Sequence, residues 1–534
     1  MRRSWRAGPH GPFRSVRERI LMAVDHSGSA SHDPTIVASS PSAAIVVDGF
    51  EAAAAHSSLH NDELAPTAPA QRKWGWFEIF NVWTNDVQSL AGYTLAASLF
   101  VTAGINGWFV LAAIVLSGAL VMFFVNWSGR PSVKYGIPYP VVARASMGVR
   151  GGMFPATVRG IVAIFWYGAQ TYFASTAVAL AINAVLGSAP TATFLGMNWV
   201  DWVSYTAVAG FQIWLFVRGL DGIVKFLNFA GPAVYAVMIL LLVAIWWQAG
   251  SGLLSSVGDL FAGEKQGTAA LAAFVGVVGT MIAYFSAVII NFGDFARFTR
   301  SDREMKRGNL LGLPVSLTFF TLLSLFITAG AYIVFQGGQG DPMTNPADIV
   351  GAVGNVWLSI LAAVTFFIAT VGINLVANFI PPVYDIVNLK PEKLNFRIAG
   401  FITAALGFVI GALWVSMIGN AGLPKFVDTL GAVLAPLYGI MIADYFLLRR
   451  QQLKLQDLYS VDPAGTYYFT KGWNVRALWA FAVSGVFAVS AVWVPALHAL
   501  SGFAWVFGAA LGAALHWVVM RGQPLEAPKP SVAA

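Results

Sequence analysis

The stretch NVWTNDVQSLAGY, residues 81–93, decides the fold because it places polar side chains inside a long apolar run. Its amide and acidic residues before Gly92 are Asn81, Asn85, Asp86 and Gln88. An acidic side chain at the centre of a membrane helix costs about 2.5–3.5 kcal/mol on insertion scales, so it needs a partner or water. We expect the Ser89–Gly92 segment to unwind. Asp86 and Gln88 then either line a binding site at the interruption or tie this helix to its neighbours by hydrogen bonds.

The whole chain has the composition of a polytopic membrane protein. Of its 534 residues, 57% are hydrophobic and only 11% are charged, which is outside the usual range of soluble domains. Apolar stretches of about 20 residues predict twelve transmembrane helices, called spans 1 to 12 below. They lie near residues 77–104, 106–126, 156–185, 199–217, 222–248, 269–291, 309–335, 348–380, 397–416, 424–447, 477–496 and 500–520.

The predicted fold is therefore an all-α integral membrane protein with a twelve-span membrane domain at residues 71–521. Residues 1–70 are rich in Ser, Ala, Pro and His and are expected to form a disordered cytoplasmic tail. Residues 522–534 are expected to form a short cytoplasmic tail.

The distribution of Lys and Arg predicts the orientation. The loops after spans 2, 6, 8 and 10 carry basic residues, whereas those after spans 1, 3, 7 and 11 carry none. Because cytoplasmic loops accumulate Lys and Arg, both termini are predicted to be cytoplasmic, in a multi-pass protein of the cell (inner or plasma) membrane. The net charge of +7 reflects this topology and does not indicate nucleic-acid binding.

Several classes of function are disfavoured by what the sequence lacks. It has no cysteine, and five of its seven histidines lie in the first 60 residues, so no metal site, cofactor or disulfide is expected. It contains no HExxH or GxSxG motif and no paired carboxylates in the spans, so no catalytic residues are predicted. Twelve spans in one chain do not indicate a channel built from a short repeated pore motif.

Two spans carry amides on one helical face. In IVAIFWYGAQTYF of span 3, Trp166 and Gln170 are four residues apart and Gly168 leaves room between them, which suits a flat, hydrogen-bonding ligand or an ordinary helix interface. In span 8, Asn374 and Asn378 also share a face, and Pro381-Pro382 is expected to close that helix. Each Asn either binds a cyclic amide edge or joins two helices.

At this point the motifs resemble those of the nucleobase:cation symporter-1 family, which carries uracil, cytosine, allantoin and hydantoins. The matching stretches run from about residue 74 to 480. They are NDVQSLAGYTLAASLF, YGIPYPVVARASMGVRG, WYGAQTY, NFGDFARF, NLVANFIPPVYDIVNL and LAPLYGIMIADYFLLRRQQLKLQDLYS. The resemblance implies the LeuT-like architecture of two inverted sets of five spans plus two C-terminal helices.

The resemblance also implies a substrate site between spans 1, 3, 6 and 8. The family's sodium-coupled hydantoin transporter sandwiches its ligand between two tryptophans, whose positions correspond to Trp166 and Phe285 here. Its ligand-binding amides correspond to Gln170, Asn378 and, on span 1, Gln88. The expected partners are thus a small nucleobase or cyclic amide, a coupling cation and the lipid bilayer, and the protein is expected to be a monomer.

The cation site departs from the family pattern. A Ser-Thr hydroxyl pair of the sodium site falls on Gly372 and Ile373, which carry no side-chain oxygen. Backbone carbonyls at the remaining positions, those of Thr84, Val87 and Ala369, are kept. We therefore expect H⁺ rather than Na⁺ coupling, with Asp86 as the proton carrier; sodium-coupled transport and cytosine or purine specificity are the alternatives.

Overall fold

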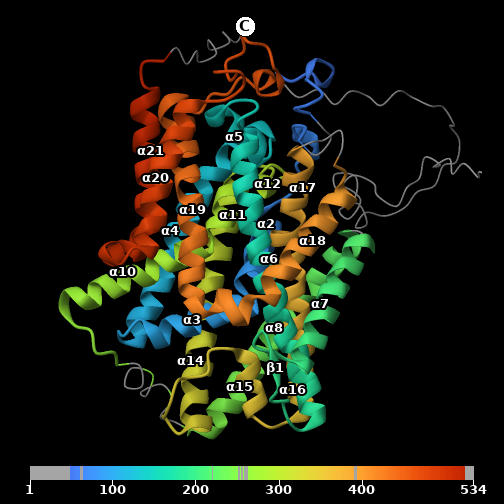
Figure 1. Cartoon of the computed structure of the whole chain (residues 1–534), viewed down its shortest axis with the longest axis vertical. Helices are drawn as coiled ribbons and strands as arrows, with labels where there is room; N and C mark the ends of the chain where they lie inside the picture. Colours follow the sequence, from blue (N-terminus) through green and yellow to red (C-terminus); the bar gives the residue numbers. More distant parts are fainter. Residues whose placement is uncertain are drawn as a thin grey trace, which may run out of the picture.

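The computed structural model shows an elongated bundle of helices (Figure 1). It describes residues 49–60, 64–218, 220–250, 262–389 and 394–523, together with Leu253 and Val257. The helices within the predicted spans are α2 (Trp76–Val87), α3 (Leu90–Thr102), α4 (Gly107–Tyr135), α6 (Met153–Leu186), α7 (Trp199–Arg218), α8 (Leu220–Ala249), α10 (Gly267–Tyr284), α11 (Ser286–Asn291), α14 (Ser316–Gln336), α16 (Val356–Ile373), α17 (Ile380–Leu389), α18 (Phe396–Ala412), α19 (Leu423–Ile442), α20 (Val475–Trp493) and α21 (Ala504–Met520).

Shorter elements connect them. Most are single helical turns or short helices: η2 (Ala52–Ala54), η3 (Pro69–Gln71), α5 (Tyr139–Met147), α12 (Gly293–Ala296), α13 (Asp302–Leu310), α15 (Pro346–Ala352), η8 (Gly419–Ala421), η10 (Gln456–Tyr459) and η11 (Pro495–Phe503). The only strands in the described part of the chain, β1 (Thr193–Phe194) and β2 (Met197–Asn198), pair antiparallel in a small hairpin.

The predicted all-α membrane fold is confirmed, although a count of twelve spans is not established. By length and apolar character, nine helices of the described residues can cross a membrane, or ten if the pair Phe396–Ala412 and Trp414–Ala421, bent by 51°, is one crossing. Each predicted range nevertheless coincides with helical structure. In chain order the predicted spans correspond to α2 with α3, α4, α6, α7, α8, α10 with α11, α14, α16 with α17, α18, α19, α20 and α21.

Four π turns widen the helices at η5 (Leu311–Val315), η6 (Asn374–Phe379), η7 (Trp414–Ile418) and η9 (Ala443–Leu448). The turn η6 corrects one prediction. Pro381-Pro382 does not close span 8, because α17 runs through both prolines to Leu389. A proline disrupts an α-helix through its missing N–H and its clash with the carbonyl four residues earlier. Here both prolines lie in the first turn after a π turn, where the regular i→i−4 pattern is already interrupted.

We call one end of the bundle the terminal end; it is formed by residues 49–60 and 64–72, α5 and the loop 449–474 (Figure 1, top). The Phe50 ring packs 4.7 Å from the Tyr459 ring, and the Tyr459 hydroxyl donates to the Leu64 carbonyl at 2.6 Å. The Thr67 N–H donates to the Gly136 carbonyl at 2.8 Å. The predicted disordered tail therefore ends earlier than residue 70, since residues 49–60 and 64–70 are folded; residues 1–48 and 61–63 lie outside the described residues.

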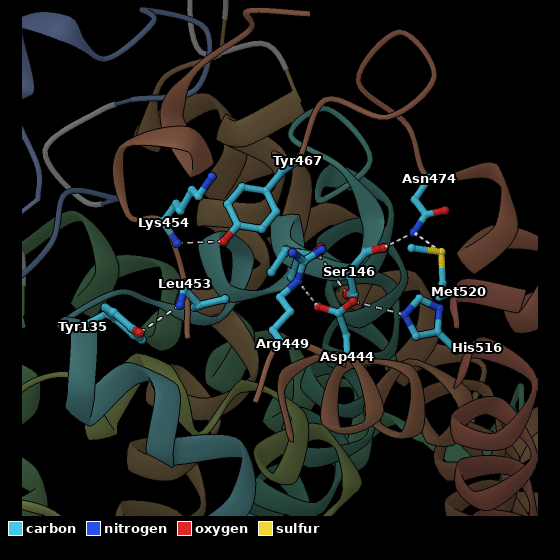
Figure 2. Close-up of polar contacts among 12 residues, drawn as sticks. Tyr135, Ser146, Asp444, Arg449, Leu453, Lys454, Tyr467, Asn474, His516 and Met520 are labelled. Atoms are coloured by element: carbon cyan, nitrogen blue, oxygen red, sulfur yellow. Dashed lines mark hydrogen bonds and ion pairs between the residues drawn. The ribbon is translucent and has the colours of Figure 1, made fainter. Parts of the chain in front are cut away.

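A buried ion pair joins the last spans to α5 at this end (Figure 2). The Arg449 guanidinium lies 2.6 Å from the Asp444 carboxylate and donates to the Ala145 carbonyl at 2.7 Å. His516 Nε2 lies 3.3 Å from the other Asp444 oxygen. Because all three side chains are at most 4% exposed, the pair fixes the start of the loop 449–474 against α5 and α21.

Candidate functional site

Span 1 is interrupted at two residues. The helix α2 ends at Val87, and the extended backbone of Ser89 (φ −70°, ψ 155°) separates it from α3. Ser89 caps α3, because its Oγ accepts the Gly92 N–H at 3.0 Å. A Cβ at position 92 would lie 2.8 Å from the Val87 carbonyl oxygen, so the close return of the chain requires glycine. The interruption predicted for Ser89–Gly92 is thus confined to Gln88 and Ser89.

Span 6 is interrupted at Phe285, between α10 and α11, and the two interruptions meet. The Tyr284 hydroxyl lies 3.1 Å from Ser89 Oγ and donates to the Asp86 carbonyl at 3.3 Å. Helix ends inside a membrane leave backbone groups that need partners. Here a side chain of one broken helix satisfies the other, which fixes the relative position of spans 1 and 6.

Span 3 adds an aromatic ring and an amide to this junction. Gln170 Nε2 donates to Ser89 Oγ at 3.2 Å, while Gln170 Oε1 is buried without a hydrogen-bond partner among the described residues. The Trp166 ring, one helical turn away, lies 5.4 Å from the Tyr284 ring and 5.3 Å from the Phe426 ring of α19. We call Trp166, Tyr284 and Phe426 the ring cluster. It places a free amide acceptor one turn from an indole surface.

The rings of the cluster meet edge to face. The Trp166 plane makes angles of 89° with Tyr284 and 76° with Phe426. A flat ligand held between two parallel rings needs centroids about 7 Å apart, twice the contact distance of about 3.5 Å between stacked carbon atoms. The described arrangement therefore holds no ligand-sized slot between its rings, and stacking of a ligand on Trp166 requires one neighbouring ring to move.

Phe285 does not face Trp166, contrary to the prediction. Its fully buried ring lies 6.1 Å from the Trp83 ring and 4.9 Å from the Tyr284 ring. Trp83 is in turn held by its indole N–H, which donates to Asn309 Oδ1 at 2.7 Å. Tyr284 and Phe285 are consecutive residues at a helix end, so they point in different directions, and Tyr284 is the ring that span 6 directs at Trp166.

Gln88 is buried at the same interruption but belongs to another side of span 1. Its amide faces the Tyr235 hydroxyl of α8 without reaching hydrogen-bond geometry, so both amide atoms are unpaired among the described residues. The Tyr235 hydroxyl itself lies 2.9 Å from Ser316 Oγ. No described contact joins Gln88 to Gln170, so the structure does not bring these two predicted ligand-binding amides together.

The two span 8 amides form a chain of hydrogen bonds. Asn374 Nδ2 contacts the Tyr167 carbonyl at 3.1 Å, Thr171 Oγ1 at 3.1 Å and Gln212 Oε1 at 2.9 Å. Asn378 Nδ2 donates to Asn374 Oδ1 at 3.2 Å. Asn374 therefore joins spans 3, 4 and 8. No described contact connects Asn378 to the ring cluster, and its place in the ligand site stays a prediction.

Spans 1 and 8 meet where the cation site was predicted. Thr84, Val87 and Ala369 are all buried, and the Thr84 hydroxyl has no hydrogen-bond partner among the described residues. The Leu90 N–H at the start of α3 donates to Thr370 Oγ1 at 3.3 Å. Thr370, which follows Ala369, thus supplies a span 8 hydroxyl at this contact. Thr370 was not predicted from the sequence.

Asp86 lies on α2, next to the interruption of span 1. Its side chain is partly exposed, and no described residue forms a hydrogen bond or an ion pair with its carboxylate. The Asp86 carboxylate is close enough to the Tyr284 side chain for the two to interact electrostatically. Gly372 and Ile373, which follow Thr370 in the last turn of α16, are buried and offer only backbone oxygens.

Four residues of this site were not predicted: Ser89, Tyr284, Phe426 and Thr370. A signal for Ser89 was present, because a serine before an apolar run is a preferred helix N-cap. Tyr284 was visible as a neighbour of Phe285. Phe426 and Thr370 lie in ordinary apolar sequence, and only the packing of spans 10 and 8 identifies them.

The geometry defines a class of protein. Two interrupted membrane helices meet at their breaks, and a third helix contributes an indole and an amide to the same point. Discontinuous helices of this kind provide the binding sites of secondary transporters near the middle of the bilayer. The fold and the site are thus those of a membrane transporter that works by alternating access.

Comparison with known proteins gives the family. Residues 66–520 match the family described as permeases for cytosine/purines, uracil, thiamine and allantoin. The chain is 30% identical over 474 residues to an allantoin permease of Bacillus subtilis (strain 168), covering 87% of this chain and 94% of that protein. It is 29% identical to a purine-uracil permease of Arabidopsis thaliana, with 88% and 79% covered. The chain belongs to this permease family, and it is a transport protein rather than an enzyme.

Solved structures show the same fold. The nucleobase-cation-symport-1 family transporter Mhp1, in a closed conformation with bromovinylhydantoin bound, superposes with a TM-score of 0.70 at 23% identity, covering 88% of this chain and 98% of that one. Its inward-facing conformation gives a TM-score of 0.72 at 22% identity, with 89% and 97% covered. These similarities confirm the predicted LeuT-like architecture.

Proposed function

We propose that this permease imports a nucleobase or a related cyclic amide, such as uracil, allantoin or a hydantoin, together with a proton. The observation that carries the substrate class is the joint placement of Trp166, Tyr284 and the unpaired Gln170 Oε1 at the meeting point of two broken helices. A flat ring offers a face to the indole and an N–H to the amide oxygen. The relatives include allantoin and purine-uracil permeases, and the superposed transporter binds a hydantoin.

The contacts proposed for the ligand give useful affinity only when all three amides reach it. Each hydrogen bond contributes about 0.5–1.5 kcal/mol net, and stacking of a flat ring on an aromatic side chain about 1–3 kcal/mol. Micromolar binding corresponds to about 8 kcal/mol. One stacked face and three amide contacts sum to about 2.5–7.5 kcal/mol, so affinity near the micromolar range requires a helix movement that brings Gln88 and Asn378 to the ligand beside Gln170.

Proton coupling is proposed from the side chains at the junction of spans 1 and 8. The absence of hydroxyls at Gly372 and Ile373 leaves a hard cation such as Na⁺ with fewer oxygen ligands. Asp86, beside the interruption and without a described partner, is the carboxylate that we assign to the coupling proton. Uptake into vesicles under a pH gradient without Na⁺, compared with a Na⁺ gradient at constant pH, tests this. Uptake that requires Na⁺ at constant pH refutes proton coupling.

Sodium coupling is the second candidate, favoured by one observation. Thr370 places a hydroxyl at the contact between α3 and α16, where its oxygen accepts the Leu90 N–H. Together with the carbonyls of Thr84, Val87 and Ala369, this hydroxyl offers Na⁺ a partial oxygen shell. The same gradient experiment decides between the two candidates.

We propose that the terminal end faces the cytoplasm of a cell (inner or plasma) membrane, so that both termini are cytoplasmic, and that one chain forms the functional unit. The support is the accumulation of Lys and Arg in the loops at that end. Labelling of single cysteines from outside intact cells tests the orientation, and the chain contains no native cysteine that interferes.

The substrate assignment is tested with purified protein. A thermal-shift screen against uracil, allantoin, cytosine, purines and hydantoins is expected to give a shift for one cyclic amide class. Gln170→Ala is expected to abolish that shift without loss of expression, and Trp166→Phe to reduce it. Normal binding by Gln170→Ala places the ligand elsewhere and refutes this site.

A further inference from the structure

Asp428 is a second carboxylate of the membrane part that the site above does not use. It lies in the second turn of α19, two residues after Phe426 of the ring cluster. Its side chain is partly buried and faces the Thr280 hydroxyl of α10 without reaching hydrogen-bond geometry. Charged side chains inside membrane helices are costly and mark functional pathways unless they are paired. The partner of Asp428 is therefore the first question.

No described cation faces Asp428. On its own helix, the Lys425 ammonium lies 4.1 Å from the centroid of the Trp493 ring, on α20. The helices α3, α10 and α11 and the turn η8, which all pack against α19, contain no charged residue. The other elements packed against α19 are α4, α5, α6, α20, α21 and the turn η9. Their charged or titratable residues lie toward the terminal end: Arg130, Lys134, Arg144, Arg159, Arg476, His516 and Asp444.

The other acid of span 10 shows the contrast. Asp444 is paired with Arg449 at 2.6 Å and with His516 at 3.3 Å, and this buried group serves to fix the terminal end (Figure 2). Asp428 has a hydroxyl neighbour and no described cation. A carboxylate without a counter-ion in apolar surroundings is stable only when it binds a proton or is reached by water.

Two polar residues of α10 lie between Asp428 and the centre of the site. Thr280 and Tyr284 are four residues apart, so they lie on one face of α10, about 5–6 Å between Cβ atoms. The Tyr284 hydroxyl then reaches Ser89 Oγ at 3.1 Å and the Asp86 carbonyl at 3.3 Å. Helix α19 packs tightly here, since a Cβ at Gly431 would lie 2.5 Å from the Ala283 Cβ. Thr280, which Asp428 faces, thus lies one helical turn from Tyr284, whose hydroxyl contacts span 1 beside Asp86.

We infer that Asp428 is a second proton-binding residue of the transport cycle, which takes up the coupling proton from the side opposite the terminal end. A proton from water binds the Asp428 carboxylate and returns to water when it is released. No other bond changes. Phe426 and Asp428 both lie near the start of α19. Neutralisation of the Asp428 carboxylate therefore accompanies the packing of α19 on α10 and of the Phe426 ring on Trp166. This inference rests on the proposed proton symport.

The test uses the full chain in proteoliposomes with radiolabelled allantoin and uracil. A gradient of one pH unit supports about tenfold accumulation by a one-to-one symporter. Asp428→Asn is expected to lower accumulation to the outside concentration while keeping counterflow exchange at symmetric pH within about twofold of the wild type. Asp341→Asn, an exposed carboxylate of the loop after α14, is the control and is expected to behave as the wild type.

The outcomes separate the inference from the proposed function. Wild-type accumulation by Asp428→Asn overturns the role of Asp428 and leaves proton symport standing. No substrate-dependent proton uptake by the wild type refutes proton symport itself, and the inference with it. If Asp428→Asn is inactive in both assays, Asp428→Glu decides: restored accumulation supports the inference, and continued inactivity shows a structural role and overturns it.

Discussion

The close return of the chain at the span 1 interruption makes Gly92→Ala the sharpest test of the site. The added Cβ would lie 2.8 Å from the Val87 carbonyl oxygen, 3.0 Å from the Tyr284 hydroxyl and 3.3 Å from Ser89 Oγ. The backbone contact is 0.6 Å shorter than the ordinary limit of 3.4 Å, and a carbonyl cannot rotate away as a flexible side chain can. The substitution must therefore move α3 or the Tyr284 ring.

The expected magnitude follows from overpacking, which costs about 1–3 kcal/mol. If the displaced Tyr284 loses its contacts to Ser89 and to the Asp86 carbonyl, we expect weaker binding by about 5- to 150-fold, together with a lower melting temperature of the ligand-free protein. Gly276→Ala is the matched control, because it lies on the broken span 6 with no atom within 4 Å of its Cβ position. It is expected to keep wild-type affinity and to melt no lower.

The assay is binding of radiolabelled allantoin and uracil to detergent-purified protein, with melting curves of the same preparations. The two readouts separate a local effect on the site from general loss of structure. Wild-type affinity and wild-type melting of Gly92→Ala would show that α3 does not return as closely as described. The geometry assigned to Ser89 and Tyr284 would then be refuted.

Three further outcomes are expected. Arg449→Ala leaves the buried Asp444 carboxylate with only its His516 contact and is expected to destabilise the protein by about 3–5 kcal/mol, whereas Lys306→Ala, which breaks an exposed pair, changes stability by about 0–1 kcal/mol; melting curves check both. Tyr284→Phe is expected to weaken substrate binding about 2- to 10-fold through the lost hydroxyl, while Phe285→Leu alters stability more than affinity; equal effects on affinity contradict the assignment of Tyr284. Thr370→Val is expected to keep proton-driven uptake in the absence of Na⁺. If the variant instead loses uptake and added Na⁺ restores it, the result favours the sodium alternative.

The interruption of span 1 could be predicted because polar residues and a glycine in an apolar run have few structural explanations. The pairing of Trp166 with Gln170 on one face was equally accessible, since a four-residue spacing on a regular helix fixes relative direction. Both predictions depend only on local geometry. The same holds for Asn374 and Asn378, which share a face and are joined by a hydrogen bond of 3.2 Å.

The choice between Tyr284 and Phe285 could not be predicted from the sequence. Consecutive residues of a helix point about 100° apart, and an interruption between them changes this angle by an amount that depends on the tertiary packing. Phe285 is held by Trp83 on one side, and Tyr284 by Ser89 on the other. Both sets of partners are about 200 residues away in the chain, so one sequence contains no local signal for the outcome.

The edge-to-face packing of the ring cluster connects ligand binding to helix movement. Trp166 lies on span 3, whereas Tyr284 and Phe426 lie on spans 6 and 10, so the cluster joins three helices through contacts worth about 0.5–1.5 kcal/mol for each ring pair. A substrate that stacks on the indole must replace at least one of these contacts. A ligand shifts a conformational equilibrium only by its difference in affinity for the two states. Here the two conformations differ in substrate affinity, because the buried Trp166 indole can stack on a ligand only when span 6 or span 10 has moved away from span 3.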